Sequence, residues 1–378
     1  MSRPDAKGWC PGALRPMQSG DGLIVRVRPV LARLSAAQVD GLCMLSQTFG
    51  NGTIDLTSRA NLQLRGFDET GLEAVQDALA TLDLLDADAE TETRRNIISA
   101  PFWQPNDQTE ALSRGLIDRL GDLPDLPGKF GFAIDTGPAR VLGGVSADIR
   151  MERDRDQNLI VRADGAGGGR LVDAGTAIDA VIEMARWFET TRDASTRRMA
   201  AAVARGELPA DWQRQPPCDP APTLEPGQIG DDAVYGVPFG RINAADLRAL
   251  MQASGGDTLT VTPWRMFALP GTQLRALPGF VTTPDAALMQ VDACPGMPNC
   301  ASASVETRQL AQALAPRYGA AGLHVSGCAK GCARPRAAHH TLVGRDGLFD
   351  LVEAGCSWDE PKRHGLSPAA LLSGTETL

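Results

Sequence analysis

The first regular pattern along the chain is an alternation of apolar and polar positions. In GLIVRVRP (22–29) this alternation predicts a strand that carries Arg26 and Arg28 on one face. Apolar residues then recur at helical spacing between Ser35, a suitable N-cap, and Gly50, a natural stop. This part of the chain is therefore expected to form a strand followed by a helix.

Two further alternating runs and a second helical pattern complete this unit. The runs cover residues 54–56 and 62–65, and apolar residues at helical spacing follow over 72–82. The resulting order, β-α-β-β-α, is that of a ferredoxin-like unit. The sequence thus predicts an α+β fold of this type for the first part of the chain.

The same plan recurs in the second half of the chain. Residues 242–247 match 34–39 in pattern, and TPWRMFALPG (262–271) aligns without gaps on TSRANLQLRG (57–66). Because these matches occur within the same order of elements, we interpret them as an internal duplication. Two unrelated α+β domains with similar strand patterns are the alternative.

A block with strand-like runs and at least one helix follows each ferredoxin-like unit. The first block includes a helix predicted near 177–204 and a hairpin at the glycine-rich 163–170, and the proline-rich stretch 208–227 separates the halves. The predicted domains are a ferredoxin-like half-domain (1–88), an α+β domain (89–207), a linker (208–230), a second ferredoxin-like half-domain (231–289) and a second α+β domain (290–378).

Composition narrows the class of protein. The chain has 378 residues, a net charge of -9 and a pI near 5.1, which argue against a general nucleic-acid-binding surface. No apolar stretch approaches the roughly 20 residues of a membrane span, and the N-terminus does not resemble a signal peptide. We therefore expect a cytoplasmic protein with no nucleic-acid or membrane partner. Disulfides are rare in that compartment, so spaced cysteines there indicate metal, cluster or catalysis.

Four of the eight cysteines form two local pairs. CPGMPNC contains Cys294 and Cys300, and HVSGCAKGCARP contains Cys328 and Cys332. Four thiolates are the number that a 4Fe-4S cluster needs. The five-residue gap is wide for a structural zinc site, and neither pair has the CxxC spacing of redox motifs. A cluster is the favoured interpretation, with zinc and four buried structural cysteines as alternatives.

The arrangement C-x5-C, long gap, C-x3-C in the second half of a duplicated chain resembles that of the sulfite and nitrite reductase superfamily. The resemblance covers nearly the whole chain. It implies a pseudo-twofold fold of two ferredoxin-like half-domains and two α+β domains, with a tetrapyrrole bound between the halves. It also implies that Cys294, Cys300, Cys328 and Cys332 bind a 4Fe-4S cluster, and that Cys332 approaches the centre of the tetrapyrrole.

A tetrapyrrole of this kind carries several carboxylates, which arginine pairs with bidentately. The resemblance implies that the tetrapyrrole or an anion is bound by residues from VRVRP, LTSRANLQLRG and ETRRNII and by one lysine: Arg26, Arg28, Arg59, Asn61, Gln63, Arg65, Arg95 and Lys129. For any one of these arginines alone, an exposed charge on a strand or turn is the simpler interpretation.

Two departures from the reductases change the expected substrate. Sulfite reductases carry a basic run of the kind LPRKFK, whereas this chain has LPGKFG, which keeps Lys129 and places Gly128 and Gly131 where basic residues would stand. The N-terminal KGWCPGALRPM, and FGNG followed by LTSRANLQLRG, resemble the precorrin-3B synthases of aerobic cobalamin biosynthesis. In that family the tetrapyrrole is the substrate.

The resemblance to precorrin-3B synthases implies an O2-dependent monooxygenation of precorrin-3A, with hydroxylation at C20 and formation of a γ-lactone. It implies two metal centres, the 4Fe-4S cluster and a mononuclear non-haem iron. Because no Rossmann or flavin-binding fingerprint is found, an external electron donor, NADH-linked, is expected. Transfer of the product to the next cobalamin-pathway enzyme is a further expectation.

The sequence identifies neither catalytic residues nor ligands of the mononuclear iron. His339 and His340 are adjacent and would point to opposite faces of a strand. For His324, near Cys328, a satisfied structural histidine is the favoured interpretation, and for Cys10 an inert thiol in a turn. Two other functions stay open: a sirohaem-dependent sulfite or nitrite reductase, and a non-catalytic zinc- or cluster-bearing binding module.

Overall fold

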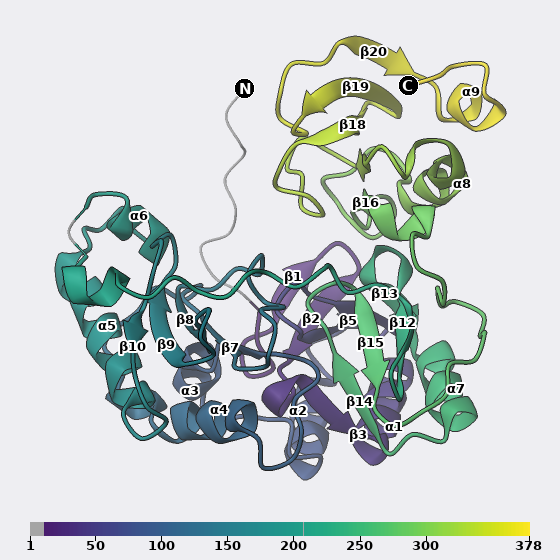
Figure 1. Cartoon of the computed structure of the whole chain (residues 1–378). Coiled ribbons are helices and arrows are strands. Elements are labelled where there is room, and N and C mark those ends of the chain that lie inside the picture. Colours follow the sequence, from purple (N-terminus) through teal and green to yellow (C-terminus); the bar gives the residue numbers. More distant parts are fainter. Residues whose placement is uncertain (1–10, 207) are drawn as a thin grey trace.

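The computed structural model describes residues 11–206 and 208–378, so Cys10 lies outside the described residues. Within this part the chain forms four five-stranded sheets. Figure 1 shows two ferredoxin-like sheets next to one another, a first lobe in teal beside them, and a C-terminal lobe in green and yellow. In the same ranges no helix combines the length and apolar character that a membrane span requires.

The first ferredoxin-like sheet follows the predicted β-α-β-β-α order. Its strands, in spatial order, are β1 (Met17–Ser19), β2 (Gly22–Val27), β5 (Leu62–Phe67), β4 (Thr53–Leu56) and β13 (Arg241–Asn243), covered by α1 (Ala36–Thr48) and α2 (Leu72–Thr81). The predicted N-cap is confirmed, because Ser35 and Gln38 form a reciprocal capping box at the start of α1.

The second ferredoxin-like sheet repeats this order with one helix fewer. Its strands are β11 (Gly227–Ile229), β12 (Asp232–Gly236), β15 (Met266–Leu269), β14 (Thr258–Val261) and β3 (Arg33–Ser35), with α7 (Ala244–Ser254). No helix follows β15 where α2 follows β5. Pro278, Gly279 and Pro284 interrupt that segment, and the irregular chain packs Leu274, Leu277 and Phe280 on the core instead.

The duplication is confirmed at the level of backbone geometry. In the turns before β5 and β15, the N–H of Thr57 donates to the Asn61 carbonyl at 2.9 Å, and the N–H of Thr262 donates to the Met266 carbonyl at 3.0 Å. Ala60 and Arg265 both adopt positive φ, 54° and 60°, at matching positions. The gapless alignment read from the sequence is therefore a structural equivalence.

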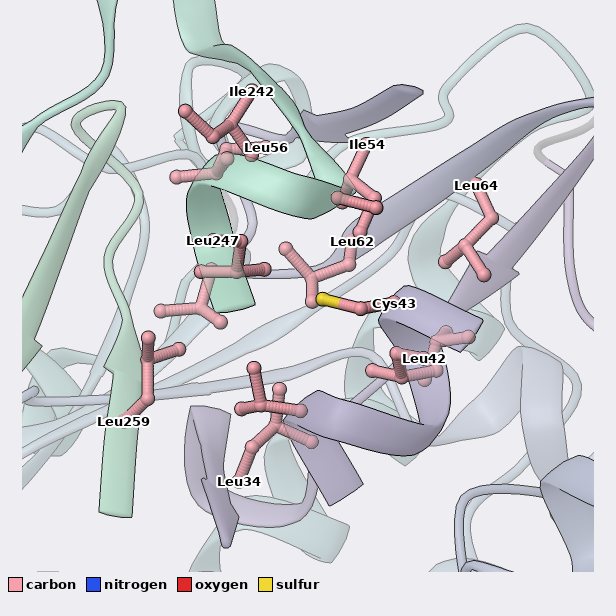
Figure 2. Packing of buried hydrophobic residues seen from close by; sticks show 14 of the residues in the cluster. Leu34, Leu42, Cys43, Ile54, Leu56, Leu62, Leu64, Ile242, Leu247 and Leu259 are labelled. Carbon is pink, nitrogen blue, oxygen red and sulfur yellow. The ribbon is translucent and has the colours of Figure 1, made fainter. Parts of the chain in front are cut away.

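The two half-domains exchange short strands. β13 of the second half pairs antiparallel with β4, and β3 of the first half pairs antiparallel with β14. Leu34 and Leu259 lie opposite each other in one of these pairs. The exchange merges the two helix-covered faces into a single core, in which Leu42 and Leu62 gather with Leu247 from the other half (Figure 2). Each half therefore depends on the other for its last strand.

The first lobe has a mixed sheet of β10 (Arg170–Leu171), β9 (Leu159–Ala163), β8 (Ile149–Arg153), β7 (Phe132–Asp135) and β6 (Ile97–Ser99). The predicted hairpin at 163–170 is confirmed as the β9–β10 connection. The lobe also contains α3 (Ala89–Arg94), α4 (Gln108–Asp118), α5 (Ala177–Thr191) and α6 (Met199–Val203).

The single helix predicted near 177–204 is wrong in its length, since α5 ends at Thr191 and α6 begins only at Met199. Between them the Asp193 carboxylate accepts hydrogen bonds from the backbone N–H groups of Ser195 and Thr196, both at 2.8 Å. This turn competes with helical hydrogen bonding and breaks the helix.

The C-terminal lobe, here called the cysteine lobe, repeats the topology of the first. Its strands are β16 (Val291–Ala293), β17 (Leu323–Ser326), β18 (Ala338–Arg345), β19 (Leu348–Gly355) and β20 (Arg363–Leu366), with α8 (Arg308–Tyr318) and α9 (Pro368–Ser373). In each lobe the first three strands along the chain, β6 to β8 and β16 to β18, pair in parallel, and the two later strands pair antiparallel.

The proline-rich connector lies against the first lobe. Gln215 exchanges two backbone hydrogen bonds with Gly169, and the N–H of Cys218 donates to the Arg153 carbonyl at 2.9 Å. The connector thus extends along the edge of that sheet before the chain enters β11. The domain boundaries at 88, 207, 230 and 289 remain a prediction.

Leu34→Ala tests the strand exchange. Leu34 is fully buried in β3 against the second sheet, so the substitution is expected to lower the free energy of unfolding by about 2–5 kcal/mol. Urea unfolding followed by circular dichroism measures this. Val30→Ala, at a nearby residue that is 37% exposed, is the control and should change stability by less than about 0.5 kcal/mol. Equal losses in both variants would contradict the exchange as a source of stability.

Candidate functional site

The four paired cysteines meet at one edge of the cysteine lobe. Cys294 and Cys300 follow β16, and Cys328 and Cys332 follow β17, which is the parallel neighbour of β16. The carboxyl ends of parallel strands lie at the same edge, so both pairs emerge together. Desolvation within the protein raises the pKa of Cys332, and the charges of the other three thiols raise it further, so the four thiols are close enough for their charges to interact. We call these four residues the cysteine quartet.

Backbone groups surround Cys294. The N–H of Gly327 donates to its sulfur at 3.1 Å, and the Thr307 hydroxyl donates to its carbonyl oxygen at 2.6 Å. Burial raises the pKa of the Cys294 thiol, while the N–H groups of Gly327 and Gly296 act in the opposite direction. Bound metal replaces such thiol protons, and N–H donors then stabilise the thiolate charge.

The quartet supplies the number and kind of donors that an iron–sulfur cluster takes. In residues 11–206 and 208–378, no three or more His, Cys, Asp or Glu side chains converge closely enough to hold one ion. A 4Fe-4S cluster, by contrast, takes four thiolates spread around a larger object. The donor set and the N–H groups directed at sulfur are suited to such a cluster. The mononuclear iron finds no comparable ligand set in the same residues.

A row of polar side chains crosses the face of the first ferredoxin-like sheet that is opposite α1 and α2. Arg26 lies opposite Gln63, Gln63 opposite Asp55, and Asp55 opposite Arg241 of the exchanged strand. Residues directly opposite one another share a face, so the four side chains form one line across four strands. We call this line the polar row.

Asp55 pairs with arginines on both sides of it. Arg241 donates to its two carboxylate oxygens at 2.6 and 3.0 Å, and Arg65 donates to it at 3.2 Å. Arg65 also donates to Asp21 at 2.6 and 2.8 Å and is only 4% exposed. Arg65 is therefore engaged with protein carboxylates, whereas Arg26 and Gln63 are half-buried at the other end of the row.

The turn that Arg65 fixes touches the cysteine quartet. Asp21 lies in the turn between β1 and β2, and a Cβ on Gly20 of this turn would stand 2.8 Å from the Ala301 nitrogen and 3.1 Å from the Cys300 Cα. Only glycine allows so close an approach. The first half-domain thus packs directly on the first cysteine loop.

The equivalent row on the second ferredoxin-like sheet is mostly apolar. Val234, Ala268 and Thr260 occupy the positions of Arg26, Gln63 and Asp55, by the same cross-strand pairing. That face is covered by Phe102, Leu224, Trp264 and Met289. Ala100 is the counterpart of Cys294, because its N–H donates to a carbonyl of β7 as the N–H of Cys294 donates to a carbonyl of β17. Ala100 carries no thiol. The duplicated architecture therefore keeps one polar face and one set of cysteines.

Two other predicted arginines form buried ion pairs next to the polar row. Arg28 lies 3.3 Å from Glu92, and Arg95 binds Asp86 through two nitrogens at 2.7 and 2.8 Å. Arg95 also donates to the Arg28 carbonyl at 2.9 Å, which joins the two pairs. Burial lowers the pKa of Arg28, and Arg26 and Arg95 add to this against the opposing charge of Glu92.

The remaining predicted residues lie around the Lys129 loop. Arg59 donates to the Lys129 carbonyl at 2.8 Å, and Asn61 closes the turn before β5. A Cβ on Gly128 would meet only the Thr93 side chain, at 3.9 Å, but a Cβ on Gly131 would stand 2.6 Å from the Asn96 side chain. The absence of a side chain at Gly131 therefore does not enlarge a pocket, because Asn96 fills that volume and donates to the Phe130 carbonyl at 2.7 Å.

His324 does not have the hydrogen bonds expected of a structural histidine. It is fully buried on β17 beside Asp292 of β16, yet within the described chain neither ring nitrogen has a hydrogen-bond partner. Burial lowers its pKa to about 4, so the ring is neutral. Asp292 itself pairs with Arg265 at 3.2 Å and Arg334 at 2.9 Å. The described side chains and backbone therefore do not supply the hydrogen bonds that a satisfied structural histidine makes.

The loop between β7 and β8 is the counterpart of the Cys328–Cys332 loop. Asp135 accepts a hydrogen bond from the Leu142 N–H at 2.6 Å, and Arg150 donates to the carbonyls of Leu142 and Val145 at 2.9 and 2.5 Å. Burial raises the pKa of Asp135 to about 6, and the charge of Glu152 adds to this effect. One buried carboxyl group and one guanidinium thus hold this loop.

The two best-defined surface cavities contain none of the predicted site residues. One, of about 540 Å³, lies on the first lobe and is lined by residues such as Arg153, Asn158 and Asp173. The other, of about 200 Å³, is lined by Arg94 and Gly128 beside the Lys129 loop. Neither cavity includes a cysteine of the quartet or a residue of the polar row.

Sequence reasoning missed Arg241, Asp55 and Arg308. Arg241 directly precedes the run 242–247 that matches 34–39, and its counterpart Arg33 is also arginine, so a repeat one residue longer would have revealed it. Asp55 and Arg308 carry no local signal, because their importance arises from contacts between distant parts of the chain.

Known proteins resemble this chain in sequence and in fold. Residues 15–82 match the family model described as nitrite/sulfite reductase ferredoxin-like half domain. A curated relative, the precorrin-3B synthase of Sinorhizobium sp, is 30% identical over 386 residues, which cover 93% of this chain and 83% of the relative.

The structure of the Mycobacterium tuberculosis NirA protein is similar with a TM-score of 0.62 at 18% sequence identity. The match covers 93% of this chain and 79% of that chain. At this identity the likeness shows the fold, a duplicated α+β architecture of the nitrite/sulfite reductase type.

Asp135→Asn is expected to change how stability depends on pH. The folded-state pKa of Asp135 is raised from 3.8 to about 6, so the folded state holds this proton more tightly than the unfolded chain. The contribution of this protonated carboxyl group to stability is therefore largest below the pKa that it has in the unfolded chain, and it is lost as pH rises through about 6. Asparagine removes that loss, which is about 3 kcal/mol for a shift of roughly two units.

Denaturant unfolding of both proteins at several pH values between about 4.5 and 8 measures this effect. The variant should gain stability relative to the parent as pH rises, with no further change above the raised pKa. A difference between the two proteins that stays constant over this range would contradict the assignment.

Proposed function

Because the chain belongs to the precorrin-3B synthase family, we propose that this enzyme catalyses the O2-dependent monooxygenation of precorrin-3A in aerobic cobalamin biosynthesis. The reaction would hydroxylate C20 and close the ring A acetate as a γ-lactone. The name of the Sinorhizobium relative supports the reaction, and the nitrite/sulfite reductase fold supports a tetrapyrrole as ligand.

One observation carries the proposal: the polar row of the first sheet adjoins the cysteine quartet, while the equivalent face of the second sheet is covered by apolar side chains. A polycarboxylated macrocycle needs cationic and amide side chains on its periphery, and electron transfer requires it to lie close to the cluster. The duplicated fold offers both on one face only.

The residues of that face would bind and orient the substrate. Arg26 and Gln63 can donate to its carboxylates from the row, and Arg59 and Lys129 can do so from the neighbouring loop. A charge-assisted hydrogen bond contributes about 1.5–3 kcal/mol, so a few of them fix the macrocycle. Arg28, Arg65 and Arg95 would act mainly by holding this surface in place, since each is already paired with a protein carboxylate.

Cys294, Cys300, Cys328 and Cys332 would hold the 4Fe-4S cluster, which supplies one-electron transfer when bound. The N–H of Gly327 would stabilise the Cys294 thiolate, and the Gly20 contact would keep the cluster loop against the substrate-binding half-domain. An external donor, NADH-linked, would deliver the electrons. A mononuclear iron is part of the proposal only as an expectation, and no step is assigned to it.

The LPGKFG loop favours this reaction over reduction of sulfite or nitrite. Lys129 is retained, but Gly128 presents no side chain and leaves space beside the loop. A small inorganic anion needs several close cations, whereas a macrocycle can be held by charges distributed around its rim. The product would pass to the next cobalamin-pathway enzyme, which is a prediction about partners.

Turnover with precorrin-3A tests the proposed function. The purified enzyme is supplied with precorrin-3A, dioxygen and an NADH-linked reductase, and the tetrapyrrole product is analysed by mass spectrometry. We expect a product heavier by one oxygen atom, which carries the label when isotopically labelled dioxygen is used. Reduction of sulfite or nitrite without modification of precorrin-3A would contradict the proposal.

Cys332→Ser tests the quartet. Loss of one thiolate ligand is expected to remove or damage the cluster and to lower turnover about 100-fold or more, while the fold stays soluble. Iron and sulfide content, visible absorption and product formation measure the effect. Cys356→Ser, a half-buried cysteine of the same lobe outside the quartet, is the matched control and should keep both cluster and activity. Retention of both in Cys332→Ser would show that the fourth ligand is misassigned.

A further inference from the structure

Arg308 lies between the cysteine quartet and the polar row. It is the first residue of α8, and the preceding residue, Thr307, donates its hydroxyl hydrogen to the Cys294 carbonyl at 2.6 Å. On its other side, the Arg308 guanidinium is 3.9 Å from Asp55 of the row. Arg308 therefore links the loop that carries Cys294 to the first ferredoxin-like sheet.

The protein neutralises the charge of Arg308 only in part. Asp55 already accepts hydrogen bonds from Arg241 and Arg65 at 2.6 to 3.2 Å. The Nε and Nη1 atoms of Arg308 are shielded from solvent and have no hydrogen-bond partner in the described part of the chain. Burial and the charge of Arg241 lower the pKa of Arg308 to about 10, against the opposing charges of Asp55 and Cys294. Even so, Arg308 stays a cation at neutral pH.

A half-buried cation whose Nε and Nη1 atoms are shielded from solvent and lack partners in the described residues indicates an anionic group nearby. The candidates on this side are Cys294 and the other thiolates of the quartet, because Thr307, which directly precedes Arg308, donates its hydroxyl hydrogen to the Cys294 carbonyl at 2.6 Å. A 4Fe-4S cluster on four thiolates carries net negative charge, and its reduction adds one electron. The charge around a cluster is one of the factors that set its reduction potential.

We propose that Arg308 is a positioning residue that complements the negative charge of the iron–sulfur cluster and raises its reduction potential, while Asp55 limits this effect. The inference rests on the proposed function only in requiring that the quartet binds a 4Fe-4S cluster. It assigns the polar row a second role, because the carboxylate that fixes the arginines there also moderates the charge next to the cluster.

Redox titration of the purified, cluster-containing enzyme tests this inference without any tetrapyrrole substrate. The cluster is reduced by dithionite in the presence of mediators, and its midpoint potential is followed by absorption and electron paramagnetic resonance. Arg308→Gln should lower the potential by about 59 mV or more, a tenfold change in the one-electron equilibrium. Arg308→Lys keeps the charge and should stay close to the parent value.

Two further variants make the result specific. Asp55→Asn removes a negative charge beside Arg308 and should shift the potential in the positive direction. Arg317→Gln, near the other end of α8, where Arg317 donates to the Leu371 carbonyl at 2.9 Å, is the matched control and should leave the potential unchanged. Opposite shifts in the Arg308 and Asp55 variants would not result from general disturbance of the lobe.

An unchanged potential in Arg308→Gln, or shifts of the same sign in Arg308→Gln and Asp55→Asn, would overturn the inference. If Arg308→Gln fails to retain the cluster, retention in Arg308→Lys supports a requirement for charge, and equal loss in both variants contradicts it. A parent enzyme that carries the cluster but does not convert precorrin-3A would refute the proposed reaction and leave this test intact. A parent without a 4Fe-4S cluster would refute both.

Discussion

The site depends on the ion pairs that the Asp55 carboxylate forms with arginines from three parts of the chain. Arg65 from the same half-domain and Arg241 from the exchanged strand both donate to it, and Arg308 of the cysteine lobe lies 3.9 Å away. Three parts of the chain therefore meet at one buried charge. Breaking such a pair leaves guanidinium groups without compensation, which costs on the order of 3–5 kcal/mol. The carboxylate thus fixes the two half-domains relative to each other and to the cysteine lobe.

The strand exchange explains how a duplicated chain acquires a single site. Both halves use the same row of four cross-strand positions, and both rows end on an arginine of the exchanged strand. In the first sheet this arginine meets Asp55, whereas in the second Arg33 donates to Thr260 at 3.4 Å and stacks on Trp103 at 3.6 Å. The same backbone therefore supports a polar face in one half and a packed apolar face in the other.

Local patterns predicted most of the fold, because strand alternation, helix periodicity and the Ser35 capping box are decided within a few residues. The exchanged strands β3 and β13 could not be predicted, since three residues have no usable periodicity and pair only with the other half. The helix near 177–204 was overestimated because the Asp193 turn overrides its apolar pattern. The cysteine quartet was visible as spacing, whereas Asp55 and Arg308 become important only through tertiary contacts.

The predicted tetrapyrrole-binding residues fall into two kinds. Arg26, Gln63 and Arg59 are half-buried and Lys129 is exposed, while Arg65 and Arg95 are buried against Asp21 and Asp86. A sequence motif alone does not separate them, because both kinds are charged residues next to strands. The distinction follows from which carboxylates the fold brings near each arginine.

We propose that this fold presents a tetrapyrrole substrate, not a permanent tetrapyrrole cofactor, to an iron–sulfur cluster. The absorption spectrum and metal content of the enzyme purified without oxygen test this most directly. We expect iron and broad cluster absorption without tetrapyrrole bands. Strong Soret and α bands of a tightly held sirohaem, or zinc in place of iron, would contradict it.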